Sequence, residues 1–362
     1  MICPHVHFRD WNQSDKETLK HGIDVFYRAG YDGAFEMPNT DPALTSKESI
    51  VERLSLGQDA VIDLKEKHGW KTRFFYGIYA GVTSDPKQIE EVVETYNDFL
   101  NVVGLKMFAG HSTGNMGITE EEEQKKVYEL LAKLGYEGVL AVHCEKEKEL
   151  RPHLWDYKKP ITHTLARPPI AELQSGIEQL TFAEESGFEG TLHICHISVP
   201  ELVDNVQSKN LSELKFKITC GATPHHCLLH DNMMKEENGI HLKMNPPLRS
   251  KESQTHILND LINGRIDWIE TDHAPHTLEQ KMNSDSDSPF ASGIPVVPII
   301  PFFFNMLINH VSKDFLHDIT HNNIAQAFGL ENIPNSFRAG KQTEQEVKEL
   351  FEEYEFNPFK NI

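Results

Sequence analysis

The feature that most constrains the fold of this 362-residue chain is the alternation of short apolar segments with longer amphipathic ones. This alternation is typical of βα units around a parallel sheet. Four amphipathic segments are predicted to be helices, at residues 85–100, 119–134, 170–185 and 250–263. Eight apolar segments are predicted to be strands, at residues 2–8, 33–37, 72–79, 103–108, 138–143, 190–196, 216–219 and 267–271. Eight strands close a barrel, so the predicted fold class is an α/β protein with a (β/α)8 barrel of the TIM type.

The length suits a single barrel, because this fold needs about 250 residues and often carries insertions. We expect residues 1–333 to form the barrel and residues 334–362 to form a C-terminal tail with one helix packed on it. The polar run at residues 283–288 is expected to be a loop after the eighth strand. No second domain is required.

The charge balance and the cysteine content limit the classes of partner and compartment. The chain has 35 Lys+Arg against 55 Asp+Glu, a formal charge of −20 that would repel a phosphate backbone. No apolar run reaches the roughly 18 residues of a membrane span, and no basic-then-apolar signal peptide opens the chain. Five cysteines are a sparse, odd set, which favours a reducing cytoplasm and no disulfides. We expect a cytoplasmic protein with neither a nucleic-acid nor a membrane partner.

Polar residues stand at the ends of predicted strands that should be apolar throughout. The first strand finishes His5-Val6-His7, and alternation along a strand points both imidazoles to one face. The other strands bring Lys106, His143, His196 and Asp272. Any one of 20 histidines could be an ordinary core residue, but several ligand-type residues at carboxyl strand ends predict one shared metal site.

Seven short motifs carry these residues and their neighbours. They read Pro4-His5-Val6-His7-Phe8-Arg9-Asp10, Met37-Pro38-Asn39-Thr40, Gly104-Leu105-Lys106, Val142-His143-Cys144-Glu145, His193-Ile194-Cys195-His196, Asn245-Pro246-Pro247-Leu248-Arg249 and Thr271-Asp272-His273-Ala274-Pro275-His276. Together they resemble the amidohydrolase superfamily and, within it, the dihydroorotases, over most of residues 1–300. The arginine after the histidine pair, the Met-Pro-Asn-Thr motif and the Asp-His-Ala-Pro-His motif distinguish this resemblance from hydantoinases and allantoinases.

The resemblance implies two Zn²⁺ ions per chain. Their ligands would be His5, His7 and Asp272 for one ion and His143 and His196 for the other. Lys106 would bridge the ions together with a hydroxide, and it could do so only as a carboxylated lysine, because an ammonium group has no lone pair. The alternative for Lys106 is an ordinary surface cation, but its apolar Gly-Leu-Lys-Met-Phe setting predicts burial. Asp272 would be the catalytic residue, taking a proton from water and passing it to the departing amide nitrogen.

The resemblance also implies a set of substrate-binding residues. They are Arg9, Asn39, Thr113, Asn245, His276 and Gly293. Arg9 offers a planar fork that suits a ring carboxylate, and because it lies two residues beyond His7, strand alternation would place it on the same inward face. Thr113 would supply a hydroxyl from a loop that covers the substrate. The alternatives are a surface salt bridge for Arg9 and a turn position for Asn39.

Two departures from the family pattern affect the architecture. Many dihydroorotases begin with a strand that joins a small sandwich beside the barrel, whereas this chain starts directly before its first predicted strand. Residues 339–362 also lack a Gly-rich strand pattern, so little or no accessory β-sandwich is expected. After the eighth strand, Val296-Val297-Pro298 replaces the usual Gly-Leu-Glu run.

The implied activity is reversible zinc-dependent hydrolysis of (S)-dihydroorotate to N-carbamoyl-L-aspartate in de novo pyrimidine biosynthesis. Two alternatives remain. Another cyclic amidohydrolase, such as a hydantoinase or dihydropyrimidinase, would share the metal ligands and lack the carboxylate clamp. A non-catalytic barrel that partners another pyrimidine enzyme would be free to lose ligands, and this chain keeps the whole set. The expected partner is the small-molecule substrate, and a homodimer is the candidate assembly.

Overall fold

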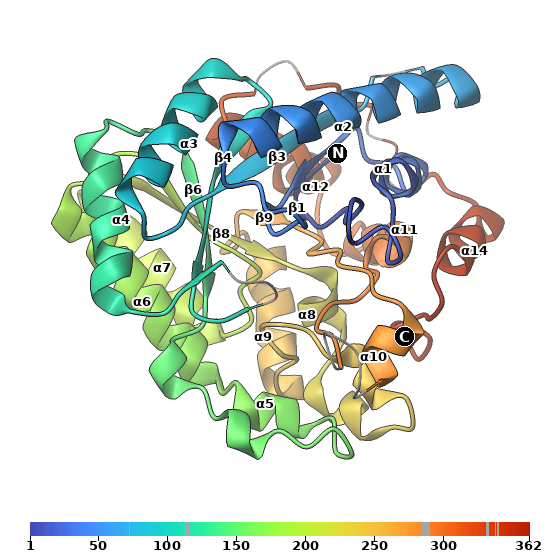
Figure 1. Ribbon diagram of the computed structural model, residues 1–362. Helices are drawn as coiled ribbons and strands as arrows, with labels where there is room; N and C mark the ends of the chain where they lie inside the picture. The colour runs from blue at the N-terminus through green and yellow to red at the C-terminus, as the bar shows by residue number, and fades with distance from the viewer. Residues whose placement is uncertain (72, 113–115, 284–289, 331–332, 337, 339) are drawn as a thin grey trace.

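The computed structural model describes residues 1–71, 73–112, 116–283, 290–330, 333–336, 338 and 340–362. A parallel sheet in the order β1-β2-β3-β4-β6-β7-β8-β9 curves around the centre of the molecule (Figure 1). The strands are β1 (Ile2–Val6), β2 (Gly33–Glu36), β3 (Phe75–Gly81), β4 (Val102–Ala109), β6 (Val139–Cys144), β7 (Thr191–Ile194), β8 (Lys217–Ala222) and β9 (Trp268–Ile269). The predicted eight-stranded barrel is confirmed, and β5 (Gly117–Ile118) only extends the edge of β4.

The first and last strands meet through a short parallel bridge between Val6 and His273. The amide of His7 donates to the carbonyl oxygen of His273 at 2.8 Å, and the amide of Asp272 donates to that of His5 at 3.1 Å. The closure of the barrel therefore places the His5 and His7 segment directly beside the Asp272 segment, although the two are far apart in the sequence.

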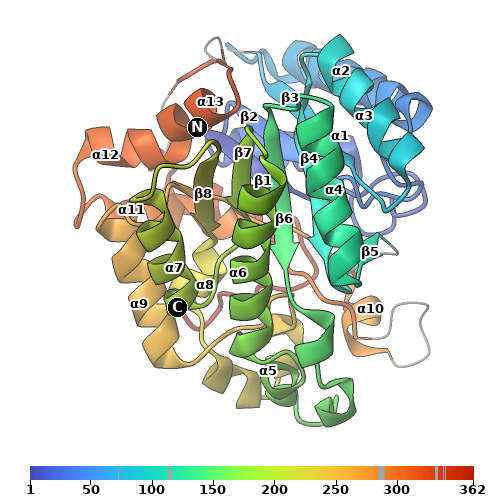
Figure 2. The same cartoon turned by 90° about the vertical axis from the view of Figure 1, so that its left-hand side faces the viewer.

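Helices surround the barrel on its outer face (Figure 2). The longer ones are α1 (Leu19–Arg28), α2 (Lys47–His68), α3 (Pro86–Asp98), α4 (Glu121–Lys133), α6 (Pro169–Ser186), α7 (Pro200–Asn210), α9 (Lys251–Ile262) and α11 (Ile300–Leu307). The four predicted helices correspond to α3, α4, α6 and α9. Their ends follow local chemistry, since Ser250 caps the start of α9 and Gly187, at φ 70°, ends α6 in the left-handed conformation.

Shorter helices follow several strands or close the ends of the barrel. They are α5 (Thr162–Ala166), α8 (Pro224–Leu228), α10 (Leu278–Met282), α12 (Lys313–His317) and α13 (Asn323–Ala327). Figure 2 places α13 near the amino-terminal ends of the strands. There Phe328 packs against Phe35, Tyr79 and Trp268 of the barrel interior. This apolar plug fills the end of the barrel opposite the carboxyl strand ends.

The C-terminal segment contains one further helix, α14 (Glu344–Glu352). Leu350, Phe356 and Phe359 are buried in the main apolar core. The hydroxyl of Tyr354 donates to Glu17 at 2.8 Å. Within the described ranges every strand belongs to the barrel sheet, all five cysteines are free and buried, and no helix is long and apolar enough to cross a membrane.

Candidate active site

A small cavity opens at the carboxyl ends of the strands. Its lining residues are His5, His7, Arg9, Asn39, Phe108, Ser112, His143, His196, Asn245, Asp272, Ala274, Ser292 and Gly293. The fold thus brings together every predicted site residue except Lys106 and His276, which lie behind the wall, and Thr113, which falls outside the described residues. The strand-end pattern thus predicted which of these residues lie together at the carboxyl ends of the strands.

Three side chains, from the carboxyl ends of the first and last strands of the barrel, converge on one point. The Oδ1 atom of Asp272 lies 3.3 Å from His5 Nε2 and 3.0 Å from His7 Nε2. Burial alone would raise the pKa of Asp272, but hydrogen bonds from His5 and His7 hold it well below its usual range. Burial lowers the pKa of His7 to about 4, which keeps this imidazole neutral at pH 7. Two imidazoles and a carboxylate in contact are a donor set that suits zinc and related transition metals.

A second pair of histidines faces this group across the cavity. His143 Nδ1 lies 3.2 Å from His196 Nε2, and His143 Nε2 lies 3.0 Å from Glu145 Oε2. Within the described part of the chain, Nδ1 of buried His196 has no hydrogen-bond partner. His196 adopts φ 36° and Asp272 φ 46°, left-handed values that are uncommon for residues with side chains. Such backbone strain concentrates at functional sites.

Lys106 is fully buried beneath the cavity and does not line it. Its Nζ donates to the Sγ of Cys195 at 3.1 Å and lies 4.9 Å from the centroid of the Phe108 ring. Among the described residues no carboxylate lies within ion-pair distance of this ammonium group. Among the described residues its polar side-chain partner is therefore the Cys195 thiol rather than a carboxylate, an uncommon setting for a buried lysine.

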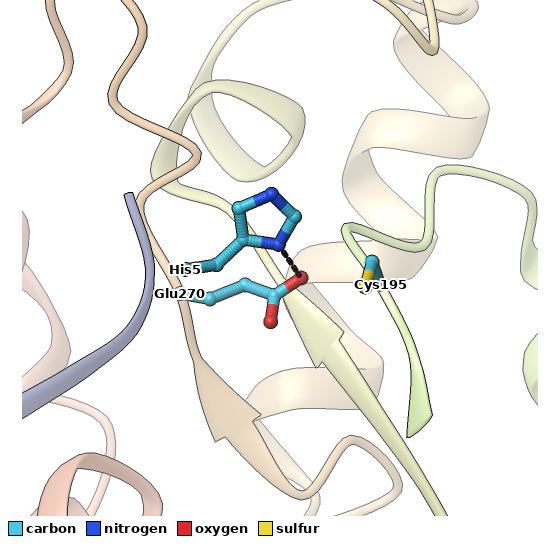
Figure 3. A group of neighbouring side chains, drawn as sticks. All are labelled: His5, Cys195 and Glu270. Atoms are coloured by element: carbon cyan, nitrogen blue, oxygen red, sulfur yellow. Dashed lines mark ion pairs between the residues drawn. The ribbon is translucent and has the colours of Figure 1, made fainter. Parts of the chain in front are cut away.

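A third group of potential ligands lies deeper, where His5 Nδ1 approaches Glu270 Oε1 at 3.7 Å beside Cys195 (Figure 3). Glu270 is fully buried and also accepts from His193 Nε2 at 2.9 Å. Burial would raise the pKa of the Cys195 thiol, but Lys106, His193 and His5 outweigh it and lower that pKa to about 5.

Sequence reasoning missed Glu270 and named Cys195 only as part of the His193-Ile194-Cys195-His196 motif. The signal for Glu270 was present, because an acidic side chain within the predicted strand 267–271 departs from the apolar pattern of a buried parallel strand. Cys195 carried no such signal, since free cysteine is among the most commonly buried residues.

Arg9 reaches the cavity by a different route from the one that the sequence predicted. Strand β1 ends at Val6, and Arg9 adopts φ 62°, so strand alternation does not orient it. A left-handed turn over Arg9, Asp10 and Trp11 directs the chain instead. The Arg9 side chain is 2% exposed, and its Nη2 lies 3.1 Å from His276 Nε2. Burial lowers the pKa of this guanidinium to about 10, and no carboxylate in the described ranges forms an ion pair with it.

The remaining predicted contacts come from loops above the strands. Asn245 Oδ1 lies 3.0 Å from His163 Nε2, which fixes the amide at the cavity wall. Gly293 adopts φ 133°, and a Cβ there would lie 2.6 Å from the carbonyl oxygen of Ala274. Only glycine fits this position, so its backbone can approach a ligand closely.

The chain shares sequence with curated dihydroorotases. The enzyme of Methanosarcina mazei is 31% identical over 344 residues, covering 91% of this chain and 69% of that protein. The enzyme of Halobacterium salinarum is 30% identical over 336 residues, with coverages of 91% and 72%. The enzyme of Brevibacillus brevis is 29% identical over 293 residues, which span 80% of this chain and only 63% of that relative. No protein-family model matches the chain.

Solved structures share the fold at lower sequence identity. An L-hydantoinase (dihydropyrimidinase) from Arthrobacter aurescens superposes with a TM-score of 0.74 at 21% identity, covering 94% of this chain and 73% of that one. A D-hydantoinase (dihydropyrimidinase) from Thermus sp. gives 0.74 at 22%, with coverages of 91% and 71%. These likenesses bear on the barrel alone. The two archaeal relatives confirm the predicted family: this chain belongs to the dihydroorotases, within the cyclic amidohydrolases.

Proposed function

We propose that this chain catalyses the dihydroorotase reaction, the reversible hydrolysis of dihydroorotate to N-carbamoyl-L-aspartate, in the cytoplasm and as a step of pyrimidine biosynthesis. The observation that carries the proposal is the buried Arg9 guanidinium, which has no carboxylate partner among the described residues and lines the same cavity as His5, His7 and Asp272. Dihydroorotate has a ring carboxylate that could pair with it. Membership of the family supports the same substrate.

We propose a site for two zinc ions, bridged by carboxylated Lys106. His5, His7 and Asp272 would hold one ion, and His143 and His196 the other. The close approach of these donors supports this assignment. When bound, such ions lower the pKa of coordinated water from about 15.7 toward 7 and polarise the amide carbonyl.

Asp272 would move the proton in this reaction. Its carboxylate lies at the centre of the histidine group, and its low pKa leaves it ionised and able to accept a proton from the attacking water. The same proton would then pass to the ring nitrogen as the amide bond breaks, because an amide anion is a poor leaving group. Ring closure of carbamoyl aspartate would use these groups in reverse.

Arg9 and its neighbours would select the substrate. The guanidinium fork pairs with a carboxylate through two parallel hydrogen bonds, and His276 orients it from behind at 3.1 Å. Asn39 and Asn245 line the cavity on either side and would contact the carboxylate and the ring. The backbone of Gly293 would approach the ring where no side chain could fit.

The test is steady-state hydrolysis by the purified protein loaded with zinc. We expect turnover of dihydroorotate, with kcat/KM at least about 30-fold above that for hydantoin or dihydrouracil, because loss of one charge-assisted pair typically costs about 2–4 kcal/mol. Faster hydrolysis of the uncarboxylated rings would favour a hydantoinase. Bound metal with no turnover of any ring would favour the non-catalytic alternative.

A further inference from the structure

Glu145 lies behind the metal-facing histidine pair and has no role in the function proposed above. Its carboxylate is fully buried, and its Oε2 lies 3.0 Å from His143 Nε2. If Nε2 carries the proton, Nδ1 is the atom left free, and Nδ1 is the atom that faces His196 Nε2 at 3.2 Å. A carboxylate in this position selects the ring tautomer and fixes the ring orientation of a metal-binding histidine.

Arg167 holds this carboxylate from the other side. Its Nε lies 3.0 Å from both Glu145 oxygens, and its Nη2 donates to Oε2 at 2.5 Å. Burial would raise the pKa of Glu145, but Arg167 and His143 together hold it well below its usual range. The buried negative charge therefore has a full counter-ion, as a buried ion pair requires.

The same guanidinium also reaches the loop that follows β4. Arg167 Nη2 donates to the carbonyl oxygen of His111 at 2.6 Å, and the next residue, Ser112, lines the cavity. The loop is packed tightly here, because a Cβ on Gly110 would lie 1.9 Å from the carbonyl oxygen of Glu145. Arg167 thus contacts both Glu145, which lies behind His143, and His111, the residue before the cavity-lining Ser112.

A second buried Glu–Arg pair holds the chain two residues after His196. Glu172 accepts from the amide of Ser198 at 2.7 Å, and Arg249 Nη2 donates to Glu172 at 3.0 Å. The two arginines are joined, since Arg249 Nη1 donates to the carbonyl oxygen of Arg167 at 2.6 Å. Arg249 belongs to the Asn-Pro-Pro-Leu-Arg motif and Glu145 to the Val-His-Cys-Glu motif, so both motifs contain a charged residue that supports a neighbouring part of the site.

We propose that Glu145 and Arg167 are positioning residues that divide two tasks: Glu145 holds His143 ready to bind metal, and Arg167 ties the Ser112 wall of the substrate cavity to that same carboxylate. The proposal rests on the proposed function, because it takes His143 as a zinc ligand and dihydroorotate as the substrate. It assigns different measurable effects to two residues that form one ion pair.

The experiment compares Glu145→Gln and Arg167→Lys with the wild-type chain. Zinc alone is the first probe, and its dissociation constant is measured on the metal-free protein by competition with a chromophoric chelator. Glu145→Gln should weaken zinc binding by about 10- to 100-fold, the usual effect of losing a carboxylate behind a metal-binding histidine. Arg167→Lys keeps a cation beside Glu145 and should change zinc affinity by less than about threefold.

The second measurement separates kcat from KM at saturating zinc. Arg167→Lys cannot reach both Glu145 and the His111 carbonyl, so KM for dihydroorotate should rise about tenfold while kcat stays within about threefold. Arg265→Gln is the matched control, because Arg265 forms an exposed pair with Asp204 and should leave zinc affinity and KM unchanged.

Unchanged zinc affinity in Glu145→Gln would overturn the first task, and unchanged KM in Arg167→Lys would overturn the second. A fall in Tm with both constants at wild-type values would reduce the pair to a structural role and also refute the proposal. If Glu145→Gln does not fold, the kcat and KM of Arg167→Lys still decide whether Arg167 positions the Ser112 wall, and unchanged values refute the proposal. If the wild-type protein does not hydrolyse dihydroorotate, the proposed function fails, while the zinc comparison still decides the role of Glu145.

Discussion

A methyl group on Gly221 would lie 2.5 Å from the carboxyl carbon of Glu270. Gly221 is on β8, opposite Trp268 of β9, and Glu270 follows β9 directly. The carboxylate cannot easily move away, because His193 Nε2 donates to it at 2.9 Å and the amide of His196 also donates to it. The absence of a side chain at position 221 therefore makes room for the buried carboxylate at position 270.

Gly221→Ala is predicted to destabilise the protein by overpacking at this point. The expected cost is about 1–3 kcal/mol in the free energy of unfolding, measured by urea denaturation. Zinc affinity should fall as well, since displaced Glu270 contacts His5 and the backbone of His196.

The double variant Gly221→Ala/Glu270→Ala provides the control. If the two side chains compete for one space, the double variant should be no less stable than Glu270→Ala alone. If the double variant instead loses as much stability as the two single variants added together, the steric relationship is contradicted, and the loss at Gly221 is a backbone effect.

The barrel could be predicted from the sequence because each βα unit appears locally as a short apolar segment followed by an amphipathic one. Each strand of a closed parallel sheet is buried on both faces, and that burial produces the apolar runs that mark strand positions. The site followed from one further fact, that carboxyl strand ends converge. His143, His196 and Asp272 could therefore be grouped although they are far apart in the chain.

The features that could not be predicted depend on the backbone conformation of turns and on contacts between residues far apart in the sequence. Arg9 enters the cavity through positive φ angles that alternation does not encode. The pairing of Glu145 with Arg167 joins two loops, and nothing local in either segment indicates it. Helix α11 comes from a proline-interrupted apolar stretch whose period alone does not identify a helix.

Lys106→Ala is predicted to lose most activity and at least one metal ion per chain. The physical reason is that a carboxylated lysine would supply an anionic ligand to the ions, and alanine offers no ligand atom. Metal content by atomic absorption and turnover of dihydroorotate are the measurements. Short carboxylic acids with excess zinc should restore part of the activity by occupying the vacated space. Full activity of the alanine variant would refute the bridging role.

Lys243 should make the stability of the protein depend on alkaline pH. Its ammonium group is largely buried, donates to Ser292 Oγ at 2.7 Å and lies 5.4 Å from the centroid of the Trp155 ring. Burial, followed by the charge of Arg167, lowers its pKa from 10.5 to about 7. Between these two values the unfolded chain binds more protons than the native chain, so this group makes stability rise with pH across that window. Below pH 7 the full cost of the buried ammonium is present.

Lys243→Met removes this titration. Relative to the wild type, the variant should be stabilised most near pH 6–7, and its advantage should shrink toward pH 10, by at most about 1.4 kcal/mol per pH unit. Unfolding free energies of both proteins in urea at a series of pH values test the prediction. Parallel profiles for the two proteins would show that Lys243 is not the group responsible.

Arg9→Met is predicted to separate substrate recognition from metal binding. The Arg9 side chain contacts His276 and the carbonyl oxygen of Pro275, and within the described ranges it has no hydrogen bond to a metal-facing donor. Loss of one charge-assisted bidentate contact costs on the order of 2–4 kcal/mol, so kcat/KM for dihydroorotate should fall by roughly 30- to 1000-fold with zinc content unchanged. Arg9→Lys should recover little, because a point charge cannot reproduce the fork.

The matched control for Arg9→Met is the substrate rather than the protein. Dihydrouracil has the same ring without the carboxylate, so its slow hydrolysis should barely respond to the loss of Arg9. If kcat/KM falls equally for dihydroorotate and dihydrouracil, Arg9 supports the shape of the site through His276 and the carbonyl oxygen of Pro275. If Arg9→Met barely changes kcat/KM for dihydroorotate, Arg9 does not bind the ring carboxylate. Within its described residues the chain would then have no feature that distinguishes dihydroorotate from other cyclic amides, which the same metal-facing residues could hydrolyse.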